Sequence, residues 1–68
     1  MEQETEKILE NIRAKRLEKN ISLLKLATNA GISHSHLYYI ETKKVVPSID
    51  VVVKIAKSME IDIADLLK

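Results

Sequence analysis

The sequence predicts a compact all-α fold, a five-helix bundle, and three observations lead to this prediction. Apolar residues recur every three to four positions through most of the chain, which is the spacing of one helix face. The 68 residues include one Gly and one Pro, too few for the many turns of a strand-rich fold. Ser or Asp stands before four of the five periodic segments, where a helix N-cap is expected. A length far below the ~150 residues of a typical domain indicates that residues 1–68 form a single domain.

The first helix is expected from about Glu4 to Lys19. It begins in an acidic N-terminal turn, residues 1–7. The negative charges of this turn stabilise the helix, because they lie at the positive end of the helix dipole. Asn20 is expected to end the helix. The apolar stripe that should face the core consists of Ile8, Leu9, Ile12 and Leu17.

Two short helices are expected next. Ser22 is the predicted N-cap of a helix over residues 23–30, and Gly31 after it can adopt the left-handed conformation that ends a helix. Ser33 then precedes a helix from His34 to about Thr42. The inner face of this helix is predicted to consist of Leu37, Ile40 and Glu41.

Two further helices should complete the bundle after a loop at residues 43–47, where Val46 precedes Pro47 and is biased to extended backbone. Ser48 is the predicted N-cap of a helix from Ile49 to about Met59, and Asp62 that of a short helix over residues 63–67. The last helix region has more apolar residues than one short helix buries. We expect these residues both to close the core and to supply a dimer contact; they are Ile61, Ile63, Leu66 and Leu67.

The composition argues against several classes of protein. The absence of Cys excludes a disulfide framework and thiolate metal sites. No apolar run approaches the ~18 residues of a membrane-spanning helix, and no signal-peptide pattern is present, so we expect a cytoplasmic protein without membrane association. His34 and His36 point about 200° apart on a helix and cannot share one metal ion. We expect no enzyme activity, no cofactor, no metal and no small-molecule ligand.

The charge is unevenly distributed along the chain. Residues 1–10 carry four Glu and one Lys, and residues 58–68 carry three acidic residues and one Lys. Residues 11–57 carry nine Lys and Arg against three acidic residues. A basic middle is consistent with a surface that binds a polyanion, and equally with a solvated surface on which Lys happens to cluster.

Residues 22–42 have the pattern of a helix-turn-helix, two short helices joined by the three-residue turn 31–33. In that motif the turn projects the second helix, which can then enter the major groove of DNA. With the inner face buried, Ser35, Tyr39 and Thr42 should face outward. The alternative is that two helices meeting at a Gly are an ordinary part of a small bundle.

Arg16 and Glu41 are charged residues at positions that face the core. Arg16 continues the spacing of Leu9 and Ile12, and Glu41 shares the inner face of its helix. Because a buried charge needs a partner, we infer that Arg16 and Glu41 form an ion pair. The alternative is that both side chains reach solvent at the edges of their stripes.

The motifs occur in a characteristic order. They are Ile12-Arg13-x-x-Arg16, Ser22-x-x-x-Leu26-Ala27, Ala30-Gly31-Ile32-Ser33, Leu37-x-x-Ile40-Glu41, Pro47-Ser48, Ile55-Ala56-Lys57-Ser58-Met59-Glu60-Ile61 and Asp65-Leu66-Leu67. This series resembles the phage repressor/Cro-type helix-turn-helix family (XRE family) over residues 8–68. The resemblance implies a lambda-repressor-like DNA-binding domain. It also implies a transcriptional regulator of bacterial or phage type, associated with the nucleoid, that binds a two-fold operator as a homodimer with helix 34–42 in the major groove.

The resemblance also implies roles for individual residues. The family's Arg–Glu ion pair falls on Arg16 and Glu41. Its base-reading positions fall on His34, Ser35 and Tyr39. The positions that contact the DNA backbone correspond to Ser22, Leu23, Thr28, His36, Thr42, Lys43 and Lys44.

The chain departs from the family pattern at three places. Leu23 stands where the family usually has Gln, and Lys43 where it usually has Gly. His and Tyr replace the usual Arg and Gln on the recognition face. Together with the apolar Val45-Val46 loop, these departures motivate an alternative function, a protein-interaction module that keeps the fold and binds a partner protein instead of DNA.

Overall fold

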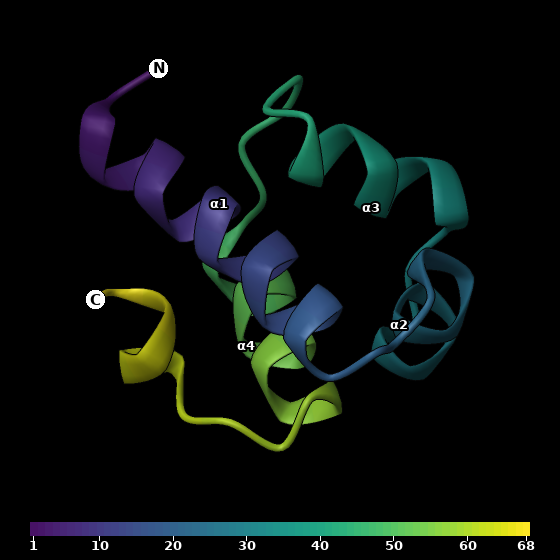
Figure 1. Cartoon of the computed structure of the whole chain (residues 1–68). Coiled ribbons are helices and arrows are strands. Elements are labelled where there is room, and N and C mark those ends of the chain that lie inside the picture. The colour runs from purple at the N-terminus through teal and green to yellow at the C-terminus, as the bar shows by residue number, and fades with distance from the viewer.

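The computed structural model describes all 68 residues and contains four α-helices followed by a short 3-10 turn. α2 packs against α3 and α4, and α1 packs against α3 and the 3-10 turn (Figure 1). The predicted helix ends differ from the observed ones by no more than one residue for the first four helices. The elements are α1 (Gln3–Glu18), α2 (Leu23–Ala30), α3 (His34–Glu41), α4 (Ile49–Ser58) and η1 (Ile63–Leu66).

The predicted fifth α-helix is wrong, because this segment forms only the turn η1. The Asp65 N–H donates to the Asp62 carbonyl at 2.9 Å, and the Asp62 N–H donates to the Asp65 carboxylate at 3.2 Å. These bonds close a tight turn within four residues, too few to continue as an α-helix. The Asn11 side-chain amide donates to the Leu66 carbonyl at 2.9 Å and holds η1 on α1. The fold is therefore all-helical, with four helices instead of five.

Serine caps begin three of the helices, as predicted. The Ser22, Ser33 and Ser48 hydroxyls accept hydrogen bonds from the third residue of α2, α3 and α4. Each cap satisfies a backbone N–H that has no partner within the helix. The serines therefore define the start of each helix through contacts within its first turn.

A left-handed residue follows each of the four α-helices, directly after Ala30 in α2 and one residue later in α1, α3 and α4. These residues have φ values of 57° to 73°: Asn20, Gly31, Lys43 and Glu60. The next residue donates its N–H to a carbonyl five residues earlier, and after α1, α2 and α4 it is an Ile packed against the core: Ile21, Ile32 and Ile61. Such an apolar residue commonly accompanies this helix end. After α3 it is the exposed Lys44, so this helix end presents a charge where the other three present an apolar side chain.

The core lies where α1, α2, α3, α4 and η1 meet. Leu17, predicted to face it, is 48% exposed, and that prediction is wrong. Successive helical residues are rotated by about 100°, so the stripe of Leu9 and Ile12 continues at Arg16 instead. None of the helices has the length and apolar character that crossing a membrane requires. The core residues are Leu9, Ile12, Leu26, Ala27, Ala30, Leu37, Ile40, Val52, Ile55, Ala56, Met59 and Leu66.

Candidate nucleic-acid interface

α3 buries one face and exposes the other, and it lies at the edge of the molecule (Figure 1). Leu37 and Ile40 are fully buried, which fixes the rotation of the helix about its axis. The turn before α3 is made by Gly31, whose φ of 73° is left-handed, and by Ile32, which packs on the core. This short, anchored turn leaves the outer face of α3 projecting to solvent.

Arg16 and Glu41 meet beneath α3. Arg16 Nε donates to Glu41 Oε2 at 2.8 Å, and Arg16 Nη2 donates to Glu41 Oε1 at 3.0 Å. Arg16 Nη1 also donates to the Ile21 carbonyl at 2.9 Å. The side chains are 12% and 4% exposed, and the structure leaves no buried side-chain polar atom without a partner. The pair ties α1 and the α1–α2 turn to the end of α3.

This ion pair also determines the charge of the exposed face of α3. Glu41 is the one acidic residue in α3, and its carboxylate is turned inward and neutralised by Arg16. The exposed side chains of α3 therefore include no carboxylate. Such a face can approach a phosphate backbone without like-charge repulsion.

The outer face of α3 holds the three residues assigned to base reading. His34 and Ser35 are exposed at its N-terminal end. Tyr38 and Tyr39 are 50% and 46% exposed, so the predicted exposure of Tyr39 is confirmed. The two Tyr rings touch edge to face, with centroids 5.8 Å apart. This contact gives the face an ordered aromatic surface beside the hydrogen-bonding groups.

The residues assigned to the DNA backbone have different surroundings. Ser22 caps α2, and Leu23 is half-buried and packs on the core. Thr28 and Lys44 are exposed, and His36 is half-buried. The hydroxyl of the exposed Thr42 donates to the Tyr38 carbonyl at 2.8 Å. No three His, Cys, Asp or Glu side chains are grouped so that they could hold a metal ion.

Lys43 has a partner that its position in the sequence does not indicate. Its ammonium forms an ion pair with the Glu10 carboxylate of α1. The hydrogen bond from Lys43 lowers the pKa of Glu10 below its usual value, and the same bond raises the pKa of Lys43. The two residues are 33 positions apart, so only the packing of α1 against α3 brings them together.

Comparisons with known proteins agree with this geometry. A family model described as helix-turn-helix matches residues 12–66. The restriction-modification controller protein C.AhdI from Aeromonas hydrophila is 25% identical with a TM-score of 0.85, over 88% of this chain and 91% of that chain. SinR, the master regulator for biofilm formation, solved in complex with DNA, is 34% identical with a TM-score of 0.81, over 90% of this chain and 98% of that chain. Among curated proteins, none matches the sequence significantly.

Proposed function

The chain belongs to the XRE-type helix-turn-helix family of DNA-binding transcription regulators, and from that premise we propose that it binds a two-fold operator as a homodimer, with α3 in the major groove. The whole chain then acts as one domain, with residues 22–42 as the DNA-binding motif. SinR, which shares the fold and 34% of its residues, was solved with DNA. This relationship supports DNA as the partner.

The observation that carries the proposal is the composition of the exposed face of α3. It presents hydroxyl, imidazole and phenol groups and no carboxylate, because Glu41 is sequestered by Arg16. We assign base contacts to His34, Ser35 and Tyr39 at the start and middle of the helix. The assigned backbone contacts surround this face: Ser22, Leu23, Thr28, His36, Thr42, Lys43 and Lys44.

Duplex binding should depend steeply on salt, because each neutralised phosphate releases counterions. Each contributes a slope of about −0.9 in the logarithm of affinity against the logarithm of salt concentration. Replacing the exposed Lys44 by Ala should weaken binding to all duplexes alike and flatten that slope by about 0.9 per subunit. Fluorescence anisotropy with a labelled mixed-sequence duplex across a salt series measures both quantities. If the slope in Lys44→Ala is the same as in the wild type, Lys44 does not contact the DNA backbone.

A second candidate function is the protein-interaction module, which the exposed apolar side chains favour. Val46, in the loop after α3, and Ile49, the first residue of α4, are 64% and 71% exposed. If this is the function, duplex binding should be weak and nearly independent of salt. The salt series thus separates the two candidates in one experiment.

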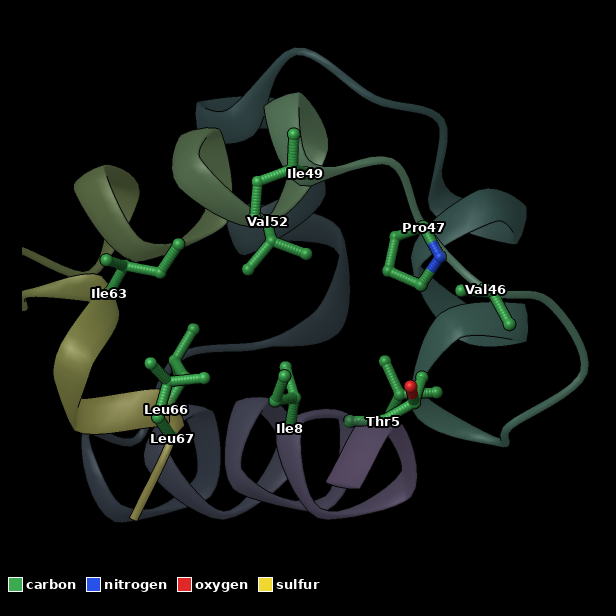
Figure 2. A pocket seen from close by; sticks show the side chains of 10 residues that line it. Thr5, Ile8, Val46, Pro47, Ile49, Val52, Ile63, Leu66 and Leu67 are labelled. Carbon is green, nitrogen blue, oxygen red and sulfur yellow. The ribbon is translucent and has the colours of Figure 1, made fainter. Parts of the chain in front are cut away.

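We assign the dimer contact to the C-terminal region together with the loop before α4. Figure 2 shows apolar side chains from α1, α4 and η1 pointing toward one another. They line a groove of about 200 Å³. Leu66 belongs to the core, whereas Leu67, Val46 and Ile49 are more than half exposed around this groove. A second copy related by a two-fold axis would cover the exposed apolar side chains and give the symmetry that a palindromic site requires.

Replacing Leu67 by Asp should weaken dimerisation by at least about tenfold, because a charge would replace a Leu that the dimer buries. Leu24→Asp is the matched control, since Leu24 on α2 is 60% exposed and Leu67 is 62% exposed. Sedimentation equilibrium of both variants and the wild type gives the dimer dissociation constants. If Leu67→Asp dimerises as the wild type does, the contact lies elsewhere on the surface.

A further inference from the structure

The two neighbouring lysines at the end of α3 differ in their surroundings. Lys43 pairs with Glu10 of α1, whereas Lys44 makes no ion pair in the structure. Lys43 occupies the left-handed position after the helix, with φ of 64°, and its ammonium reaches the carboxylate of Glu10 on α1. A lysine that we assign to the DNA backbone is thus paired with a carboxylate of the protein itself.

We propose that Glu10 restrains DNA binding by holding the Lys43 ammonium, so that a phosphate must displace an internal carboxylate to engage this lysine. The inference rests on the proposed function, because it assigns Lys43 to the DNA backbone. Glu10 acts through Lys43 and touches no base.

The surroundings of the pair support an exchange between carboxylate and phosphate. Glu10 and Lys43 line an open polar hollow together with Arg13, Glu41 and Thr42. Glu41 is occupied by Arg16, so Glu10 is the carboxylate in this hollow that neutralises Lys43. The Lys43 and Glu10 side chains are 37% and 51% exposed, and an exposed ion pair is weak enough for a phosphate to displace it.

We therefore expect Glu10 to lower the affinity for every duplex by the same factor and to leave the preference between DNA sequences unchanged. When a duplex binds the wild type, Lys43 gains a phosphate and loses a carboxylate. In Glu10→Gln it gains the phosphate without that loss. Affinity for all duplexes should then rise by about two- to fivefold at low salt, the range of one exposed ion pair, and the gain should shrink at high salt.

A double-mutant cycle tests this coupling. Duplex affinity is measured by anisotropy, with a labelled mixed-sequence duplex, for the wild type, Glu10→Gln, Lys43→Gln and the double variant. Removing a carboxylate near a polyanion could tighten binding by general charge alone, and that gain would persist without Lys43. Our proposal requires the gain to disappear in the Lys43→Gln background. It also requires the gain to persist in a Lys44→Gln background, which is the matched control.

The outcomes separate this inference from the proposed function. If the wild type shows no salt-dependent duplex binding, the proposed function fails and the inference falls with it. If the wild type binds but Glu10→Gln has no effect, or gains as much without Lys43, only the role of Glu10 is overturned. Circular dichroism melting of each variant shows whether it remains folded during the measurement.

Discussion

Replacing Arg16 by Ala should lower the free energy of unfolding by about 3 kcal/mol or more, because it strands the buried carboxylate of Glu41. Glu41 accepts two hydrogen bonds from Arg16, and its side chain is 4% exposed. The Ile21 carbonyl would also lose its bond from the guanidinium. In a chain of 68 residues a loss of this size is a large share of the total stability. Urea denaturation followed by circular dichroism measures it.

Arg13→Ala is the matched control for this prediction, because it removes the same side chain from an exposed position of α1. It should change stability by no more than about 0.5 kcal/mol. The combined change Arg16→Met and Glu41→Leu should recover much of the loss, since two apolar residues of similar volume leave no unpaired charge. An Arg16→Ala protein that unfolds at the wild-type urea midpoint would show that the pair contributes little to the fold.

Replacing Tyr39 by Ala should weaken specific DNA binding by about 1–3 kcal/mol, and Ser35→Ala should have an effect in the same range. Both side chains are exposed on the outer face of α3, so unfolding of either variant should stay close to the wild type. The specific duplex is obtained first, by selecting bound sequences from a random pool. Anisotropy with the selected duplex and with a mixed-sequence duplex then gives the specific and the nonspecific affinity.

The two duplexes distinguish reading of bases from general attraction. A base contact predicts that Tyr39→Ala loses affinity for the selected duplex and keeps its affinity for the mixed one. Equal losses on both would place Tyr39 at the backbone. A marked loss of stability would instead indicate that the ring supports the fold, for example through its contact with Tyr38.

Local sequence signals determined most of the fold. The serine caps and the left-handed residues after the helices act within one helical turn, so the chain itself sets where α2, α3 and α4 begin and where α1 and α2 end. Helical spacing also identified the buried face of α3, and with it the exposure of Tyr39. The position of Arg16 in the apolar stripe of α1 predicted its pairing with Glu41, because a charge facing the core requires a partner.

The tertiary structure decided the features that depend on how the helices meet. Leu17 lies one helical step beyond Arg16 on α1, and the side on which α3 and η1 pack buries the stripe that ends at Arg16 and leaves Leu17 in solvent. The last apolar segment forms a 3-10 turn whose contacts with α1 and α4 bury Leu66 in the core. In the sequence, Lys43 is a basic residue next to Lys44, and nothing in the neighbouring sequence indicates a partner for it. Lys43 pairs with Glu10 because α1 packs against α3. A local sequence pattern does not indicate which distant side chains such packing brings together.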